Sequence, residues 1–318
     1  MQSSDPAPQV TSLQAPASPA EERAFDTLAM LAMPSPEQHS STCLQFKTTL
    51  LKTLFSSPVA CLDTLRSRLH CLQRSGVYSP LSDLRQLHSL EHQLCRIGAA
   101  DFSKYQQLLN WIGKADWNGD DSHDRLIICT ERLETLFFLS DRLQQDLALE
   151  PTAVELLHAG LRLKQRDEVV TSFQDPRQPV RLLLCADITS ARLHLHPLSH
   201  RLVHFDLPWS GAVIRQRNAR IEHPDKRPAA QITYLNTDSR NPCVRAKQAI
   251  LSGLLQQANQ AVPLDPAAMR QHCARETAAT AATIEHDERK RGPRGAAWNR
   301  FAVTAARGQA SLAPCRTN

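Results

Sequence analysis

The sequence predicts an α/β fold in which a parallel sheet flanked by helices is preceded by an α-helical subdomain. Two observations lead to this prediction. Between residues 125 and 235, short apolar runs of strand length alternate with amphipathic stretches, which is typical of βαβ units and a parallel sheet. Between residues 24 and 111, leucines recur at intervals of three and four, which indicates a group of helices.

Composition places the chain among ordinary globular proteins. Its 318 residues are 42% hydrophobic and 22% charged, and this length allows one sizeable core and a second, smaller one. The formal net charge of +5 is compatible with a polyanionic partner but does not identify one. The nine cysteines include no Cys-x-x-Cys spacing, so we expect reduced thiols and a cytoplasmic location. The sequence has neither a signal peptide nor an apolar stretch of ~20 residues, so we expect no membrane partner.

Composition shifts divide the chain into five predicted segments. Residues 1–22 hold four prolines and no periodicity, so we expect disorder there. Residues 23–112 form the helical subdomain, in which prolines separate the helices. Residues 113–124 are a polar linker loop, residues 125–262 form the α/β domain, and residues 263–318 are a helical and then basic, disordered tail.

Five apolar runs are the candidate strands of the sheet. The run at residues 180–187 (VRLLLCAD) gives the clearest buried strand, because it is apolar on both alternating faces. The others are residues 125–129, 153–160, 201–208 and 230–235.

Polar residues follow two of these strands. Asp187 and Asp206 each end a run, and ligands of open α/β sheets gather outside the carboxyl ends of the strands. A helix then carries Gln216, Arg217 and Arg220. Two arginines three residues apart project to neighbouring positions and can clamp a phosphate. The alternatives are that the arginines form a solvated helix face and that Asp187 caps the helix after it.

The block from residue 180 to residue 223 resembles motifs V and VI of the C-terminal, RecA-like lobe of Swi/Snf-type DEAD/DEAH-box helicases of superfamily two. The resemblance is carried by Asp187 and Ser190, by the stretch 206–209 (DLPW), and by Gln216, Arg217 and Arg220. Upstream, residues 125–139 (RLIICTERLETLFFL) resemble motif IV, and residues 156–161 (LLHAGL) resemble the segment that follows it. Residues 50–69 are similar to a helical insertion of bacterial members.

The resemblance implies a role for each matching residue. Arg217 and Arg220 would be catalytic arginine fingers that face phosphate, with Gln216 and Asp187 at the nucleotide. Ser190, Thr130 and His158 would contact nucleic acid. The partner would be DNA, most simply a duplex bound through its backbone phosphates.

The sequence also departs from the family pattern. The Glu-Gly of motif V is Ala191-Arg192, and the Gly of motif VI is Ala219; glycine permits a close backbone approach that these residues do not. The 318 residues hold no Gly-x-x-x-x-Gly-Lys-[Ser/Thr] loop, which is the element that cradles phosphates in this family. We therefore expect ATP and Mg²⁺ to bind only when a separate first lobe completes the site, and we expect no ATP hydrolysis by this chain alone.

Three interpretations remain open at this point. The chain is part of a truncated or split helicase, a subunit that docks on a separately encoded ATP-binding lobe, or a nucleic-acid-binding or scaffold module that kept the fold and lost the motor. Four histidines in one stretch also suggest a zinc site. Their spacing does not match structural zinc sites, so we predict no metal there; they are His194, His196, His200 and His204.

Overall fold

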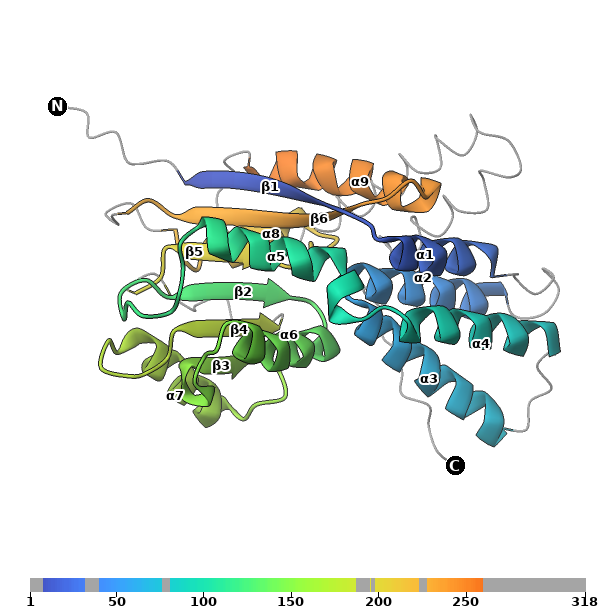
Figure 1. Cartoon of the computed structure of the whole chain (residues 1–318), viewed down its shortest axis with the longest axis horizontal. Helices are drawn as coiled ribbons and strands as arrows, with labels where there is room; N and C mark the ends of the chain where they lie inside the picture. The colour runs from blue at the N-terminus through green and yellow to red at the C-terminus, as the bar shows by residue number, and fades with distance from the viewer. Residues whose placement is uncertain are drawn as a thin grey trace.

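The computed structural model describes residues 8–31, 40–75, 81–186, 195, 198–222 and 228–259. A six-stranded sheet in the order β1-β6-β5-β2-β4-β3, with every neighbouring pair parallel, forms its centre (Figure 1). The predicted parallel sheet flanked by helices is therefore confirmed. Its strands are β1 (Gln9–Pro16), β2 (Leu126–Thr130), β3 (Val154–Leu157), β4 (Leu182–Ala186), β5 (Arg201–His204) and β6 (Gln231–Asp238).

Helices cover both faces of the sheet. Helices α5 (Ser103–Lys114) and α6 (Leu133–Asp146) bury apolar side chains against one face. Helices α7 (Leu163–Gln174), α8 (Gly211–Asn218) and α9 (Pro242–Asn259) contribute to the core on the other. Strand β2 shows the period of two that this requires, because Leu126 and Ile128 belong to the first core and Ile127 and Cys129 to the second.

The predicted helical subdomain lies beyond the carboxyl ends of the strands (Figure 1). It consists of α1 (Pro19–Met30), α2 (Ser40–Ser56), α3 (Pro58–Ser75) and α4 (Leu81–Cys95), which share a third core of leucines and phenylalanines. Val244 at the start of α9 joins this core, and α3 also contacts α6. The subdomain is thus packed on the sheet domain at the edge where parallel strands place their ligands.

The prediction that residues 1–22 are disordered is wrong from residue 9 onward. Strand β1 pairs with β6 over its whole length, from Gln9 opposite Gln231 to Pro16 opposite Asp238. An edge strand needs no apolar run, because only one of its edges is paired and its side chains are mostly exposed. Helix α1 then starts at Pro19 with a capping box between Ser18 and Glu21.

Helix α5 differs from the predicted arrangement in its partner. The sequence placed it in the helical subdomain of residues 23–112, but Tyr105, Leu108 and Ile112 pack on the sheet beside Leu126 and Ile128. The sheet domain therefore begins, after α4, at a short 3₁₀ turn (Ala99–Asp101), and a second such turn (Pro151–Ala153) precedes β3. The predicted tail of residues 263–318 lies outside the described residues.

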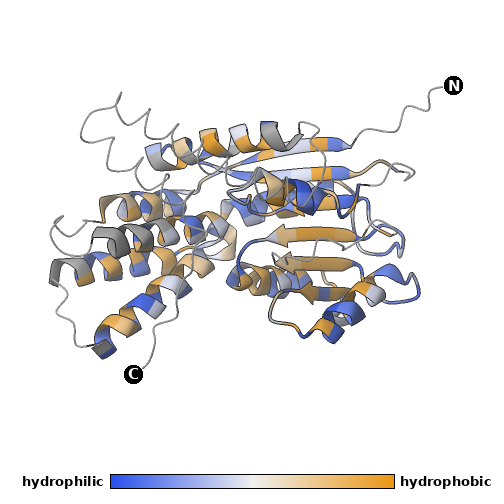
Figure 2. Ribbon diagram, turned by 180° about the vertical axis from the view of Figure 1, so that it is seen from behind, coloured by the Kyte–Doolittle hydropathy of each residue, from blue (hydrophilic) through white to orange (hydrophobic). Residues whose placement is uncertain are grey.

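The hydropathy of the strands changes across the sheet. Strands β2 and β4 are hydrophobic along their length, whereas the β1 and β6 side of the sheet is mixed (Figure 2). This contrast explains why the central strands can be recognised in the sequence as apolar runs, whereas the edge strand cannot. Within the part of the chain that the structure describes, no helix is both long and apolar enough to cross a membrane.

A buried arginine fixes the loop that enters β2. Arg125 is fully buried, and its guanidinium donates hydrogen bonds of 2.7–3.2 Å to five backbone carbonyls. These carbonyls satisfy the planar donor fork of arginine, and the guanidinium caps the end of α7. They belong to Ser122, Ser172, Phe173, Asp175 and Gln178.

Candidate functional site

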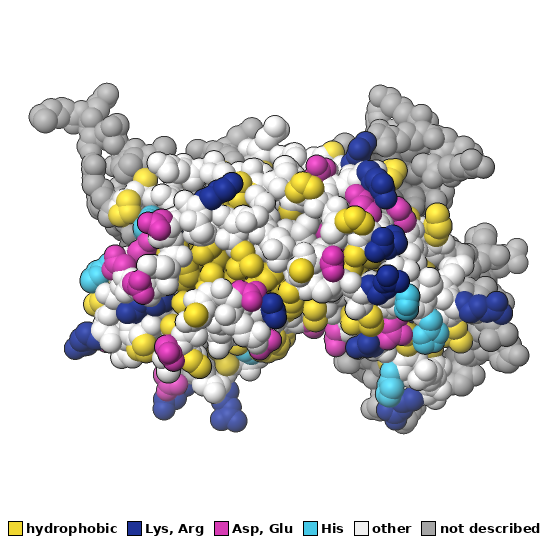
Figure 3. Space-filling view, viewed as in Figure 1, with side chains coloured by type: hydrophobic (Ala, Val, Ile, Leu, Met, Phe, Trp, Pro, Cys, Tyr) yellow, Lys and Arg dark blue, Asp and Glu magenta, His cyan; other side chains and the backbone are white. Residues whose placement is uncertain are grey.

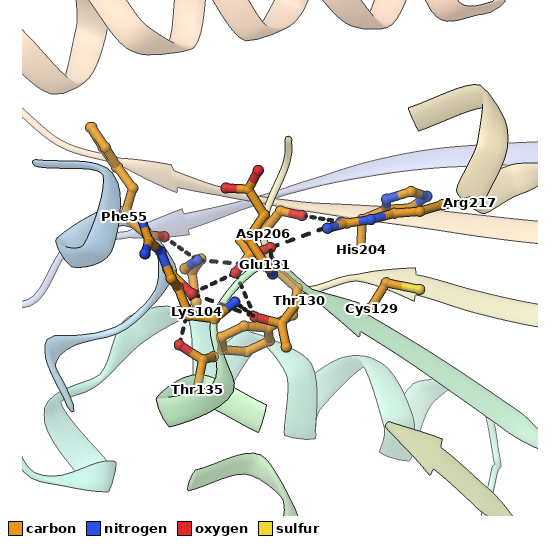
Figure 4. A network of polar contacts seen from close by, with 12 residues as sticks. Phe55, Lys104, Cys129, Thr130, Glu131, Thr135, His204, Asp206 and Arg217 are labelled. Atoms are coloured by element: carbon orange, nitrogen blue, oxygen red, sulfur yellow. Dashed lines mark hydrogen bonds and ion pairs between the residues drawn. The ribbon is translucent and has the colours of Figure 1, made fainter. Parts of the chain in front are cut away.

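The carboxylate of Asp206 is the centre of a buried polar network at the carboxyl edge of the sheet (Figure 4). Asp206 is 4% exposed. It accepts hydrogen bonds from the hydroxyl of Thr130 at 2.6 Å, the hydroxyl of Ser56 at 2.5 Å and the backbone N–H of Glu131 at 2.8 Å. Because these donors come from β2 and from the end of α2, the carboxylate joins the sheet to the helical subdomain.

Lys104 at the start of α5 completes this junction. Its ammonium donates to the carbonyls of Phe55 at 2.5 Å and Phe205 at 3.1 Å, and it lies 4.7 Å from the centre of the Phe205 ring. Complete burial lowers the pKa of Lys104 to about 8, and the attraction of Asp206 opposes this shift without cancelling it. The cost of burying this ammonium therefore exceeds the benefit of the nearby carboxylate.

The two arginines predicted to face phosphate are both buried in this structure. Arg217 is 0% and Arg220 is 4% exposed. The Arg217 guanidinium donates to the backbone carbonyl of Asp206 at 2.9 Å and lies 3.9 Å from its carboxylate. The Arg220 guanidinium points at the sulfur of Cys129, 3.8 Å away. Both guanidiniums thus lie at the carboxyl edge of the sheet, where they contact buried protein groups.

The arginines do not lie on one continuous helix as the sequence suggested. Helix α8 ends at Asn218, and Arg220 lies in the turn that follows. The reason is the side chain of Asn218, which hydrogen-bonds His204 at 2.8 Å and the hydroxyl of Tyr234 at 2.8 Å. Asparagine has weak helix propensity, and here its amide is held by the core. Gln216 is partly buried on α8.

His204 is a core residue, and it is separated from His200 by the length of β5. It lies at the end of β5, whereas His200 precedes the strand and lies 3.5 Å from Asp124 at the opposite edge, so one ion cannot bind both. Burial, reinforced by the charge of Arg217, holds the pKa of His204 well below its usual value. Among the residues that the structure describes, no group of three His, Cys, Asp or Glu is arranged to hold a metal ion. His194 and His196 lie outside those residues.

The predicted nucleic-acid residues are placed differently from one another. Thr130 is fully buried, with its hydroxyl on Asp206, so in this structure it does not face solvent. His158 follows β3 in a partly exposed position, and its ring packs edge-on against that of the exposed Phe137, with the ring centres 5.9 Å apart. Asp187 and Ser190 lie outside the described residues.

Two members of the network were not predicted from the sequence. Lys104 carried a signal, because it lies four and eight residues before Leu108 and Ile112 and therefore on the buried face of α5. Ser56 carried none. Its contact with Asp206 joins residues 150 positions apart in the chain, and its hydroxyl also bonds Thr135 at 2.7 Å.

Comparisons with known proteins agree with this geometry. Residues 103–223 match the model of the helicase conserved C-terminal domain. The RNA polymerase-associated protein RapA of Stutzerimonas stutzeri is 30% identical over 114 residues, which are 35% of this chain and 12% of that protein. The helicase domain of Pyrococcus furiosus Hef has a similar fold, with a TM-score of 0.51 at 11% identity over 76% of this chain and 58% of that one. The SWI2/SNF2 ATPase core domain of Sulfolobus solfataricus gives a TM-score of 0.49 at 14% identity, covering 80% of this chain and 45% of that one.

Residues 103–223 therefore match a helicase conserved C-terminal domain, and the sheet domain shares its fold with the Hef helicase domain. The segment aligned with RapA spans about an eighth of that protein's length. The start of the matched region at Ser103 coincides with the start of α5, the helix that the structure assigns to the sheet domain.

Proposed function

We propose that this chain acts as the C-terminal lobe of an ATP-dependent DNA translocase of the Swi/Snf type. In this role it would close on ATP and Mg²⁺ held by a lobe that carries the phosphate-binding loop. Arg217 and Arg220 would stabilise charge on the transferred phosphoryl group, and Gln216 would position them. Asp187 would couple the nucleotide to DNA held near Ser190, Thr130 and His158.

One observation carries this proposal. The Asp-Leu-Pro-Trp stretch that begins at Asp206 is bound to β2, α2 and α8 at once. A displacement of α2 or of the Asp206 backbone would therefore be transmitted to the Arg217 guanidinium through hydrogen bonds of 2.5–2.9 Å. A lobe that must move its arginines when a partner lobe closes needs such a connection.

The burial of both arginines supports a second candidate. A nucleic-acid-binding or scaffold module that kept the helicase fold would have no use for exposed fingers, and both arginine residues are at most 4% exposed. Mixing the chain with a lobe that carries the Gly-Lys-Thr loop separates the two functions. If the chain is a translocase lobe, we expect DNA-stimulated ATP hydrolysis in the mixture. If it is a binding or scaffold module, we expect none.

Duplex DNA binding is expected of the translocase and of the nucleic-acid-binding form of the module, but not of a scaffold. On the face shown in Figure 3, basic side chains are interspersed with acidic ones, so we expect weak binding that falls steeply with salt. Fluorescence anisotropy of a labelled duplex at two salt concentrations measures this, with His158→Ala beside His88→Ala, an exposed histidine of α4, as the matched control. Loss of affinity in the first variant alone is expected. No binding at low salt would contradict the translocase and the nucleic-acid-binding module, and would leave the scaffold as the remaining candidate.

A further inference from the structure

The sheet face beneath α5 is polar at the amino ends of the strands. Gln9 and Thr11 of β1 lie directly opposite Gln231 and Thr233 of β6. Two residues further along, Leu13 and Leu235 return the same face to the apolar core. Gln9 and Thr11 are exposed on the edge strand, Gln231 is half-buried and Thr233 is buried, so polar groups at different depths meet on this part of the face.

These side chains line a cavity of about 360 Å³, which lies within the usual size of small-molecule sites. Its roof is the carboxyl end of α5, where Trp111 and Lys114 are three residues apart and therefore on one side of the helix. Helix α5 runs from the carboxyl edge of the sheet at Lys104 to the amino edge here (Figure 1). Ten residues of helix separate Lys104 from Lys114, so the cavity lies roughly 15 Å from the Asp206 network.

Of the two basic side chains that line the cavity, one is held by a carboxylate and the other is exposed. Arg201 of β5 also lines it, but its guanidinium is held by Asp124 at 2.9 and 3.1 Å and by Gln231 at 3.4 Å. Lys114 is exposed on the last turn of α5. The Arg201–Asp124 pair is close to neutral, so the ammonium of Lys114 is the main charge that the lining offers to a ligand.

We propose that this cavity binds a nucleotide, with its base on the indole of Trp111 and its phosphate at Lys114. An indole offers a stacking surface to any base, and glutamine amides donate to and accept from base edges in pairs. Gln9 and Gln231 lie in register on adjacent strands. The side-chain oxygen of Gln231 accepts from Arg201, so Gln231 would offer a base its NH₂ group and Gln9 would offer its amide. Thr11 and Thr233 supply hydroxyls for the sugar or base. The site is separate from the carboxyl edge and does not depend on the function proposed above.

Quenching of tryptophan fluorescence tests this proposal on the whole chain, with AMP, adenosine and inorganic phosphate as separate probes. We expect saturable quenching by AMP and weaker quenching by adenosine. Lys114→Met should weaken AMP binding about 10-fold and leave adenosine binding unchanged, because only the phosphate loses a charged partner. Lys164→Met is the matched control, since Lys164 is an exposed lysine at the start of α7.

Calorimetry with Trp111→Leu checks the stacking separately, because this variant lacks the one of the four tryptophans whose quenching should report binding. Both AMP and adenosine should bind more weakly to it. The proposal is overturned by the absence of saturable AMP binding up to about 1 mM, or by equal losses in Lys114→Met and Lys164→Met. Duplex binding measured on the same variants keeps the two proposals apart, since Lys114→Met leaves it unchanged if only the nucleotide site is affected.

Discussion

Replacing Lys104 by methionine changes the balance between a buried charge and the two carbonyls that it satisfies. The ammonium is completely buried, and its pKa is lowered to about 8 from an unperturbed 10.5. Between these two pH values the unfolded chain binds a proton that the folded chain does not, so the free energy of unfolding rises with pH. The full difference is about 3 kcal/mol, of which about 2 kcal/mol is reached at pH 9.5.

The stability of the variant itself at pH 7 should differ only moderately from that of the wild type. Methionine leaves the carbonyls of Phe55 and Phe205 without their donor, at a cost of about 1–3 kcal/mol each. It also removes the burial cost of about 3 kcal/mol, so the net effect ranges from a gain of about 1 kcal/mol to a loss of about 3 kcal/mol. The pH dependence is therefore a sharper test than the stability at one pH.

Urea unfolding of the wild type and Lys104→Met at several pH values from 7 to 9.5 measures this difference. We expect the free energy by which the wild type is more stable than Lys104→Met to grow by about 2 kcal/mol across this range. The difference between the wild type and Lys164→Met, where the side chain is 89% exposed, should stay constant. An advantage that shrinks as the pH rises would mean that the attraction of Asp206 exceeds the cost of burial, and the reasoning would be refuted.

Three further predictions concern buried polar groups. Asp206→Asn should lower the free energy of unfolding in urea by about 2–4 kcal/mol, because one charged acceptor serves three donors. The control Asp141→Asn, on the exposed face of α6, should change that free energy little, and equal effects of the two variants would refute the prediction. Arg125→Met should cost about 3–5 kcal/mol and speed hydrogen exchange at the end of α7, with Arg177→Met as the exposed control; unchanged exchange would contradict the capping role. The pKa of His204 is held well below 6.5, so the unfolded chain takes up the proton first and stability falls below pH 6.5 by at most about 1.4 kcal/mol per pH unit. His204→Gln should show a shallower fall, and an identical slope would argue against a neutral buried histidine.

The central strands could be predicted because burial on both faces leaves a continuous apolar run. Residues 182–186 are buried at every position, and so are residues 126–130. Strand β1 could not be recognised in this way, because Gln9 and Thr11 lie on a polar stretch of the sheet face. Its only local signal was the capping box that begins at Ser18 and starts the next helix.

The candidate site was predictable in part for a similar reason. Asp206 ends a strand, and the carboxyl ends of parallel strands share one edge, so its location followed from the sequence. Its partners did not, because the contacts with Ser56 and Thr130 join residues 150 and 76 positions apart. The burial of Arg217 likewise depends on tertiary packing, since a short helix with a charged end gives no local reason for an arginine to point inward.

Steady-state ATP hydrolysis by the purified 318-residue chain, with and without double-stranded DNA, tests the central claim most directly. Arg217→Lys and Arg220→Lys keep the positive charge but not the guanidinium fork, and they are measured beside it. We predict no turnover above background in any sample, because the sequence has no phosphate-binding loop to hold ATP. DNA-stimulated turnover that either substitution abolishes would show that the chain forms a complete nucleotide site by itself, and would contradict its role as a C-terminal lobe.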